Sequence, residues 1–490
     1  MTQQRTLSLP HRRPALSGTA LVVLYLAMTA GPALAAAAIG GMHAPTFLPI
    51  LARAAGIAAL AMLLMQFLTS GRFEIVSGRI GLDRTMGFHR LAATAALLMI
   101  AAHVALFLFR GAQPSLGRVL SRLAAYLTSP AMTTGVASAG LAVVLIVVAR
   151  SFRGRGLPYP AWRLGHGAAA VLVAALALHH GVVNARFMAD PAGGGAIALL
   201  AALALGSLAF VYVVRPIQAF RHGFRVESAR RLTATVSELV LAAPAGTGFD
   251  FDAGQFAWLT IGRRHTVTDN PFSIASVPGD LPRLRFLIRD AGDMSGAVPG
   301  LAPGTPVGVD GPHGSFTLAA AGQGPLLFVA GGIGIAPVLS MIRHLSLDAD
   351  RRPVRLVAGA RTPGDHVVRA ELDELGRRLD FAALYLVDEG EDADGPSCER
   401  GTCTTGHIAG LMHGLEPAAA TAFVCGPPAM MEHAARILLD SGIPLDRIVM
   451  ERFDFDAGND EVCKAVRRRF TGVLAAVFAL VAAAALVASR

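Results

Sequence analysis

Seven apolar segments, each long enough to cross a lipid bilayer, constrain the fold of this chain more than any other feature. A helix needs about 20 apolar residues to span the hydrocarbon core. The sequence meets this requirement at residues 18–40, 47–69, 89–109, 130–149, 164–185, 193–214 and 470–489. Of all residues 53% are hydrophobic and only 16% are charged, and the apolar surplus lies in these segments. The stretch between the sixth and seventh segments has the composition of a soluble protein, so we expect membrane and soluble domains in one chain.

The arginines between the apolar segments predict how the chain is oriented. They gather before the first segment, between the second and third, between the fourth and fifth, and after the sixth. By the positive-inside rule, these loops are cytoplasmic. We therefore expect an integral protein of the plasma or inner membrane, with the lipid bilayer around its helices and its soluble domains in the cytoplasm. The same arginines explain the net charge of +9, so a nucleic-acid partner is not expected.

Both ends of the chain allow two interpretations. Residues 1–35 have the basic start and small-residue site of a cleaved signal peptide, but the apolar stretch continues to about residue 40, which favours a retained helix. The last apolar segment follows a basic stretch at 464–469 and predicts an extra C-terminal transmembrane helix. This helix either holds the soluble part against the membrane or recruits a membrane partner.

Histidines in two of the apolar segments are the first candidates for a functional site. His89 and His103 are fourteen residues apart. In a helix this spacing places them within about 40° of each other around the axis and about 21 Å apart along it. The fifth segment repeats the arrangement with His166 and then His179 or His180. Because the third and fifth segments cross the membrane in the same direction, we expect these histidines to meet in pairs at two depths.

Two facing pairs of imidazoles would hold two stacked bis-histidine haems in a helical bundle. Polar contact between helices is the alternative, but ionisable residues inside a membrane are costly and are usually functional. A fourteen-residue spacing favours His180 as the fourth ligand, whereas a local bulge or tilt would favour His179.

The membrane part resembles a known family. The stretch GLDRTMGFHR and the two spaced histidine pairs are similar to the ferric reductase-like transmembrane domain that NADPH oxidases and ferric-chelate reductases share. The resemblance implies a six-helix bundle with two b-type haems. Both histidine spacings occur on the fifth helix of that family, so the resemblance leaves His179 and His180 open.

Short segments with strand character, separated by glycine and proline, follow the sixth apolar segment and predict a small antiparallel β-barrel. Within it DNPFSIAS (269–276) resembles the flavin-binding stretch of ferredoxin reductase-type modules, and GPHGSF (311–316) closes the barrel in the same pattern. The resemblance implies that Pro271 and Phe272 lie against FAD. It also implies that the Ser273 hydroxyl reaches the reactive nitrogen of the flavin.

Phosphate contacts of the flavin are expected from two further places. Asn270 stands where the family often has Arg or His, so a positive charge on the pyrophosphate would come from Arg289 or Arg264. The stretch GDMSGA resembles the family's phosphate-binding loop, in which the backbone at Gly292 and the hydroxyl of Ser295 would cradle a phosphate.

The stretch PLLFVAGGIGIAPVLSMIRHL (325–345) predicts a buried strand, a glycine turn and an amphipathic helix. Glycines let a backbone approach a ligand closely, and a helix N-terminus favours phosphate. VRLVAGART and then AFVCGPPAMM follow as strand-and-loop segments of a parallel sheet. This order resembles the nicotinamide half of ferredoxin reductase-like proteins. The residues expected to bind the nucleotide are Gly331, Gly332, Gly334, Pro337, Arg361, Cys425, Gly426 and Pro427.

The resemblance also assigns catalytic residues. It places Cys425 beside the nicotinamide, where a buried structural thiol is the alternative, and Ser273 at the flavin. In ERFDF, either Phe455 or Phe453 would cover the flavin until the nicotinamide displaces it. Arg361 could hold the 2′-phosphate of NADPH or could be a solvated loop charge, so NADH and NADPH both stay open.

The expected architecture is a multi-domain membrane protein. Its parts are a cytoplasmic tail (1–17), a transmembrane haem domain (18–215), an FAD-binding β-barrel (216–320), an α/β NAD(P)-binding domain (321–455), and a basic linker with the C-terminal transmembrane helix (456–490). The resemblance implies an NAD(P)H-dependent flavocytochrome oxidoreductase. Electrons would pass from NAD(P)H through FAD and two haems to oxygen or a ferric chelate on the outer face. The alternatives are a membrane-anchored flavoreductase and a cytochrome b subunit that delivers electrons to a partner protein.

Overall fold

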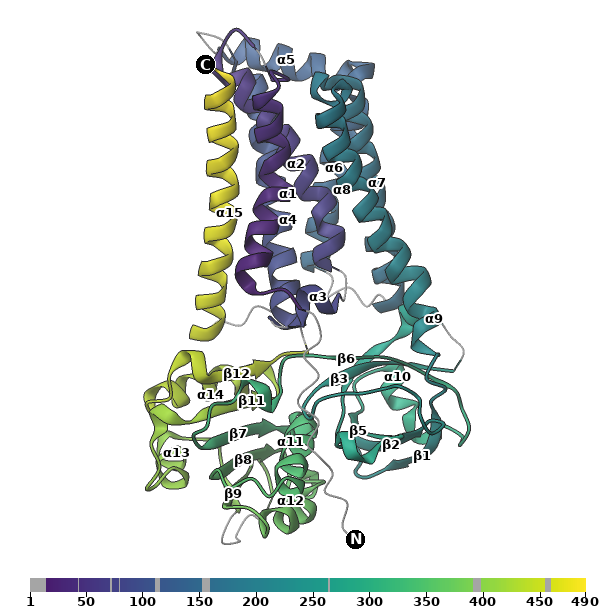
Figure 1. Ribbon diagram of the computed structural model, residues 1–490, viewed down its shortest axis with the longest axis vertical. Helices are drawn as coiled ribbons and strands as arrows, with labels where there is room; N and C mark the ends of the chain where they lie inside the picture. The colour runs from purple at the N-terminus through teal and green to yellow at the C-terminus, as the bar shows by residue number, and fades with distance from the viewer. Residues whose placement is uncertain are drawn as a thin grey trace. The chain divides into compact units, whose positions relative to one another are not determined.

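The computed structural model describes residues 15–42, 44–70, 73–78, 80–110, 115–151, 159–262, 265–390, 398–453 and 460–490. The chain divides into two compact units. The helical unit contains Leu16–Val76, Thr85–Val213 and Arg467–Arg490, and the sheet unit contains Ser77–Arg84 and Val214–Val466. The expected succession of apolar helices, antiparallel strands and a parallel sheet is confirmed (Figure 1).

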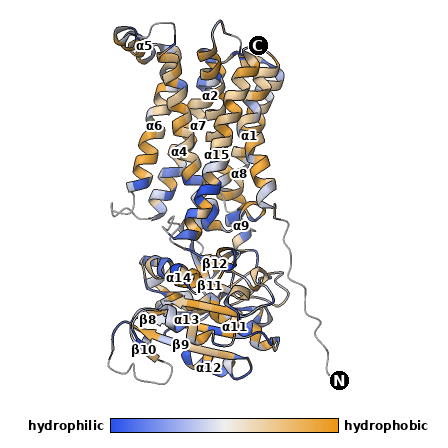
Figure 2. Ribbon diagram, turned by 90° about the vertical axis from the view of Figure 1, so that its left-hand side faces the viewer, coloured by the Kyte–Doolittle hydropathy of each residue, from blue (hydrophilic) through white to orange (hydrophobic). Residues whose placement is uncertain are grey.

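Among the described residues, seven helices are long and apolar enough to cross a membrane. They are α1 (Gly18–Ala38), α2 (Phe47–Ser70), α4 (Leu82–Leu108), α6 (Thr133–Ser151), α7 (Tyr159–Asn184), α8 (Pro191–Ala209) and α15 (Glu461–Ala488). Figure 2 shows hydrophobic residues along most of the length of these helices. Shorter helices join them: α3 (Glu74–Ser77), α5 (Leu116–Thr128) and α9 (Arg215–Ala219), the last reached from α8 through a π turn.

Two of the apolar helices begin more than one and a half turns earlier than the hydropathy pattern predicted, α4 and α15. Instead of starting at residue 89, α4 starts directly after Gly81, whose φ is +92°, and it has Asp83 in its first turn, where the helix dipole favours a negative charge. Instead of starting at residue 470, α15 starts after Asp460, whose carboxylate accepts a hydrogen bond from a backbone N–H of the first turn. Polar first turns lower the local hydropathy, which is why the apolar pattern misses them.

The core of the helical unit is built around α2, because most residues of this helix are buried by their neighbours. Small alanine side chains from several helices, α15 included, fill this core. Its buried hydroxyls donate to helix carbonyls, as Ser207 does to Phe67 (2.7 Å) and Ser138 to Val173 (2.9 Å). These bonds satisfy polar groups without water, which is what a membrane interior requires.

The sheet unit begins with two three-stranded antiparallel sheets in the orders β1-β2-β5 and β4-β3-β6. The strands are β1 (Arg225–Arg231), β2 (Val236–Ala242), β3 (Phe256–Ile261), β4 (Asn270–Ser273), β5 (Arg283–Arg289) and β6 (Val307–His313). Isolated bridges join the two sheets at Arg225–Pro306 and at Ile274–Phe286. Buried side chains from both sheets, such as Leu239 and Leu259, form one hydrophobic core.

A six-stranded parallel sheet of order β10-β9-β8-β7-β11-β12 completes the sheet unit. Its strands are β7 (Leu326–Gly331), β8 (Val354–Ala360), β9 (Phe381–Val387), β10 (Cys398–Arg400), β11 (Thr421–Cys425) and β12 (Ile448–Glu451), and its main helices are α11 (Ile335–Leu347), α12 (Arg369–Gly376), α13 (Thr405–Leu411) and α14 (Pro428–Asp440). Leu326 and Phe328 of β7 pack in the core that holds α11 and α12, while Leu327 and Val329 pack in the core that holds α13 and α14. The strand order reverses between β7 and β11. In open α/β sheets, ligands bind at the carboxyl ends of the strands at such a switch point.

Candidate functional site

The candidate histidines of the helical unit lie near one another in two pairs on α4 and α7. His89 lies within electrostatic range of His166, and His103 lies within electrostatic range of His180. The first pair belongs to the N-terminal parts of both helices and the second pair to their C-terminal parts. Two levels of imidazole are therefore present in one helical unit.

Helix α2 provides polar partners for both histidines of α4. Nδ1 of His89 lies 3.3 Å from Oγ1 of Thr69, and Nδ1 of His103 lies 2.7 Å from the carbonyl oxygen of Ala52. A carbonyl can only accept, so Nδ1 of His103 carries the proton and its Nε2 presents a lone pair. This is how a second group fixes the tautomer of a ligand imidazole.

The histidines of α7 have less uniform surroundings. His166 stacks on Trp162, with ring centroids 5.1 Å apart, and its buried Nδ1 has no hydrogen-bond partner among the described residues. His179 is exposed, and its Nδ1 lies 3.3 Å from Oγ1 of Thr134. His180 is half-buried and lies within electrostatic range of His103 on α4.

The predicted flavin-binding residues of β4 lie in the second antiparallel sheet. Ser273 is buried and stands opposite Phe256 of β3 in the register, while Phe272 packs against the core that the two sheets share. Pro271 is paired with Trp258 in the same ladder. The side-chain amide of Asn270 donates to the Thr268 carbonyl (3.2 Å), so it stabilises the turn that precedes the strand.

The GDMSGA loop forms a short turn of helix, α10 (Asp293–Gly296), whose residues are partly exposed. The Ser295 hydroxyl accepts a hydrogen bond from the backbone N–H of Ala291 (2.9 Å) and donates to the Gly292 carbonyl (3.0 Å). An added Cβ on Gly292 would meet nothing within 4 Å. Ser295 therefore shapes the loop from within, and the backbone at Gly292 is open on its outer side.

Close packing between two loops accounts for three of the expected nucleotide-binding glycines. A Cβ on Gly334 would lie 2.2 Å from the carbonyl oxygen of Cys425, and one on Gly331 would lie 2.7 Å from Cε of Met430. A Cβ on Gly426 would lie 2.3 Å from that same methyl group. The turn between β7 and α11 can thus pack against the loop after β11 only with glycine at position 334, where the clash is with backbone, whereas at Gly331 and Gly426 the nearest atom belongs to the flexible Met430 side chain.

Gly332 differs from these three glycines. It is exposed and has a φ of +53°, and a Cβ placed on it would lie 3.8 Å from Nη1 of Arg289. The guanidinium of Arg289 therefore lies beside the glycine turn at the start of α11. Pro337 is buried within that helix, and Pro427 directly precedes α14.

Cys425 ends β11 and is paired in the register with Glu451 of β12. Burial, together with the neighbouring Glu451 carboxylate, raises the pKa of the Cys425 thiol, so the thiol is neutral. Burial, followed by the charge of Asp83, raises the pKa of the Glu451 carboxyl well above its ordinary value. Among the described residues, Oε2 of Glu451 has no hydrogen-bond partner. Sequence reasoning missed Glu451 because it examined only the aromatic residues of ERFDF. A carboxylate at the end of a buried strand was the available signal.

Aromatic and glycine contacts connect this cysteine–glutamate pair to β3, the strand that pairs with β4. Phe453 packs edge-on against Phe256 with ring centroids 5.3 Å apart. A Cβ on Gly314 would lie 2.6 Å from Oε1 of Glu451 and 3.1 Å from the Phe256 ring. The structure thus brings Ser273 and the pair around one aromatic ring. Two other candidates, Phe455 and Arg264, lie outside the described residues.

Arg361, for which both a 2′-phosphate contact and a solvated loop charge are expected alternatives, directly follows β8. Arg361 is exposed and forms an ion pair with Glu389 (3.3 Å). A hollow at the carboxyl ends of β7, β8 and β9 is lined instead by residues that include Gly332, Gly359, Asp365, His366, Arg369 and Tyr385. The Arg369 guanidinium lies 4.6 Å from the centre of the Tyr385 ring. Arg369 therefore provides the cation of this hollow.

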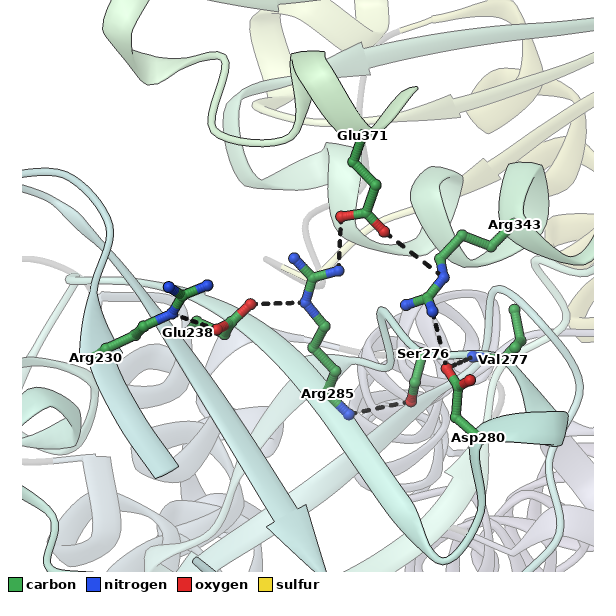
Figure 3. A network of polar contacts seen from close by, with 8 residues as sticks. All are labelled: Arg230, Glu238, Ser276, Val277, Asp280, Arg285, Arg343 and Glu371. Atoms are coloured by element: carbon green, nitrogen blue, oxygen red, sulfur yellow. Dashed lines mark hydrogen bonds and ion pairs between the residues drawn. The ribbon is translucent and has the colours of Figure 1, made fainter. Parts of the chain in front are cut away.

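An ionic network joins the antiparallel and parallel parts of the sheet unit (Figure 3). Arg285 of β5 binds Glu238 of β2 (2.8 Å) and Glu371 of α12 (2.7 Å). Arg343 of α11 in turn binds Asp280 (3.2 Å). These bridges tie β2, β5 and the turn before β5 to α11 and α12.

Apolar spanning helices, antiparallel flavin strands and a parallel sheet with a glycine turn define a membrane-bound oxidoreductase of the ferredoxin reductase type. Residues 55–177 match the family model described as ferric reductase like transmembrane component, and residues 328–436 match the oxidoreductase NAD-binding domain. The chain therefore combines a transmembrane domain similar to ferric reductases with a reductase module of the ferredoxin reductase family.

Two curated relatives illustrate this similarity. Ferredoxin–NADP reductase B of Sorangium cellulosum is 30% identical over 245 residues, which are 49% of this chain and 100% of that protein. The reductase component of propane 2-monooxygenase of Rhodococcus jostii is 33% identical over 244 residues, so the chain spans 64% of that relative's length. Among solved structures, a ferredoxin NADP+ reductase from Neisseria gonorrhoeae is 21% identical with a TM-score of 0.41, and the match covers 46% of this chain and 96% of that one.

Proposed function

We propose that this protein conducts electrons across a membrane, from NAD(P)H through FAD and two bis-histidine b-type haems to oxygen or a ferric chelate. Four imidazoles in two facing pairs, spaced along α4 and α7, carry this proposal. A six-helix bundle would form the haem domain, with α15 added to its core.

The residues present fit two haems. The Nδ1 atoms of His89 and His103 are engaged by α2, whereas the Nε2 atoms of the paired histidines form no hydrogen bond among the described residues. Nδ1 of His166 is buried without a partner. A ring nitrogen without a hydrogen-bond partner costs free energy in a membrane unless it binds a ligand. We assign His89 and His166 to one haem and His103 and His180 to the other.

We assign His180 rather than His179 as the fourth ligand. His180 interacts electrostatically with His103, and its half-buried ring faces a neighbouring helix. His179 is exposed, and its Nδ1 lies beside the hydroxyl of Thr134. The fourteen-residue spacing of His166 and His180 also equals that of His89 and His103.

The sheet unit would hold FAD and the nicotinamide nucleotide. When bound, FAD accepts two electrons from a nicotinamide and passes them on singly, which is the form that haem iron can take up. The guanidinium of Arg289 beside Gly332 would neutralise phosphate charge, and the N-terminus of α11 would add backbone donors. Ser273 and the neutral thiol of Cys425 would border the space where flavin and nicotinamide meet. Phe453 would cover it.

The arginine distribution supports a cytoplasmic sheet unit and an outer position for His103 and His180. Reducing equivalents would then enter from the cytoplasm and leave on the opposite face. A membrane partner could bind the exposed side of α15, whose other side packs in the core of the helical unit.

The test is a reduced-minus-oxidised spectrum of the purified protein, combined with iron and flavin analysis. We expect two low-spin haems and one FAD for each chain. Acceptor reduction by sealed vesicles, with NAD(P)H supplied only on the cytoplasmic face, tests the direction of transfer. A flavin spectrum without iron, after expression with ample porphyrin supply, would contradict the proposal.

A further inference from the structure

Two glycines in the helical unit are pressed against histidine rings. An ideal Cβ on Gly56 of α2 would lie 2.6 Å from Nδ1 of His103. An ideal Cβ on Gly135 of α6 would lie 2.6 Å from Nδ1 of His180. Real Cβ atoms do not approach this closely, so neither ring could keep its place beside an alanine.

We propose that Gly56 and Gly135 are positioning residues for the outer haem. Each would leave room for one axial imidazole, so that the two rings face each other from α4 and α7. This inference rests on the proposed haem function and adds to it the two residues that define the outer site.

The position of Gly56 inside a helix indicates that this glycine has a specific role. Glycine costs about 1 kcal/mol relative to alanine inside a helix, and the neighbouring positions of α2 carry alanines. The ring that needs the space is already fixed, because Nδ1 of His103 donates to the carbonyl oxygen of Ala52 at 2.7 Å. A methyl group on residue 56 would push the ring away, break this bond and turn Nε2 out of its direction.

The surroundings of Gly135 repeat this arrangement on the other helix pair. Its Cβ position also lies 2.7 Å from Cε1 and 2.9 Å from Cγ of His180, so the whole side of the ring rests on α6. The Nδ2 amide of Asn184 lies 3.3 Å from Nδ1 of the same ring and donates to the carbonyl of Ala131 (3.0 Å). The adjacent histidine, His179, has no such glycine contact among the described residues.

No glycine of the described residues presses on an inner histidine in this way. Gly87 and Gly165, which lie close to His89 and His166 along the chain, would accept a Cβ with nothing within 4 Å, and the Cβ position of Gly167 meets the Tyr212 hydroxyl (2.9 Å) instead of a histidine. Among the described glycines, contact with a histidine ring is therefore found only at the outer level.

The experiment compares Gly56→Ala and Gly135→Ala with the control Gly140→Ala, which lies on α6 and has nothing within 4 Å of its Cβ position. We expect both test variants to lose about half of the haem, or to keep it with an altered low-spin EPR signal for one haem. Flavin content and the signal of the other haem should match those of the wild type and the control. Full haem content with an unchanged EPR spectrum in both test variants would overturn the inference.

A double variant covers the case in which alanine prevents folding. Gly56→Ala combined with His103→Ala removes the ring that the methyl group would displace, so it should fold and bind haem as His103→Ala alone does. If the double variant misfolds while His103→Ala folds, the glycine serves helix packing and the inference is wrong. A wild-type protein without haem would refute the proposed function itself, whereas a haem-loaded protein indifferent to both alanines refutes only the positioning role.

Discussion

The helical unit and the sheet unit bury polar groups in opposite ways. Among the described residues of the helical unit, the buried polar ones carry only hydroxyls: Thr29, Thr69, Thr85, Ser138 and Ser207. The sheet unit buries charged groups, among them Glu238, Glu451 and Arg452, and Arg285 links Glu238 to a wider network. The two units therefore differ in the polar groups that they bury: hydroxyls in the helical unit, and carboxylates and guanidinium groups in the sheet unit.

The difference follows from the solvent around each unit. In a membrane no water can complete a polar contact, so a polar group must be neutral and satisfied by a nearby helix. In a water-soluble unit, a half-buried charge can be balanced by several partners, each partly solvated. The half-buried imidazoles of the helical unit are the exception, which is why they stand out as functional groups.

The largest effect is expected from removing an inner histidine. His89→Ala should abolish electron transfer to an acceptor across the membrane, a loss of more than about 100-fold, because under the proposed function it removes an axial ligand rather than a supporting group. If the proposed function is correct, flavin reduction by NAD(P)H, followed by stopped-flow absorbance, should continue at the wild-type rate. Acceptor reduction that persists without the inner haem would show that the helices do not carry the electrons.

The ionic network of the sheet unit gives the next largest effect. Arg285→Met should lower the free energy of unfolding of the sheet unit by about 2–3 kcal/mol, because it leaves the buried Glu238 carboxylate with one partner fewer. Chemical denaturation monitored by flavin release measures this change. Arg283→Met is the matched control on the same strand, since its ion pair with Glu227 is exposed and should contribute nothing measurable. Equal losses in the two variants would remove the distinction between buried and exposed pairs.

A smaller effect is expected from removing a hydroxyl group that lies beside a histidine of the helical unit. Thr69→Val removes the group that lies 3.3 Å from Nδ1 of His89 and should weaken inner haem binding about tenfold. Haem titration of the apoprotein measures it, and Thr471→Val, on an exposed side of α15, is the control. Unchanged affinity would mean that this hydroxyl does not orient the ring.

The smallest effect is a loss of stability of the sheet unit at low pH. Burial by itself raises the pKa of Glu238, but Arg230 and Arg285 lower it by more, so the net pKa in the folded protein is below the ordinary value of about 4.3. A lowered carboxyl pKa stabilises the fold above the ordinary pKa, and this contribution disappears as the pH falls through the folded-state pKa. The sheet unit should thus lose stability below about pH 4, and Glu238→Gln should flatten the decline. Identical pH curves for wild type and variant would exclude Glu238 as the cause.

Individual residues show which features of the structure can be predicted from the sequence. The spacing of His89 and His103 predicted two levels on one helix face, because helical geometry depends only on the number of residues between them. The choice between His179 and His180 could not be made this way, since it depends on how α7 packs against α4 and α6. The glycines of the β7–α11 turn were recognised as unusual, but the reason for Gly331 and Gly334 is a neighbouring loop that comes from a distant part of the chain.

The amino-acid sequence by itself determined the membrane helices, the order of the sheets and the residue types available for binding. These follow from local hydropathy, strand and turn composition, and helical periodicity. Tertiary structure alone decided that Glu451 lies beside Cys425, that Arg289 reaches Gly332, and that Gly56 and Gly135 receive imidazoles. The reason is physical: such contacts join segments far apart along the chain, and only packing brings their atoms within a few ångströms.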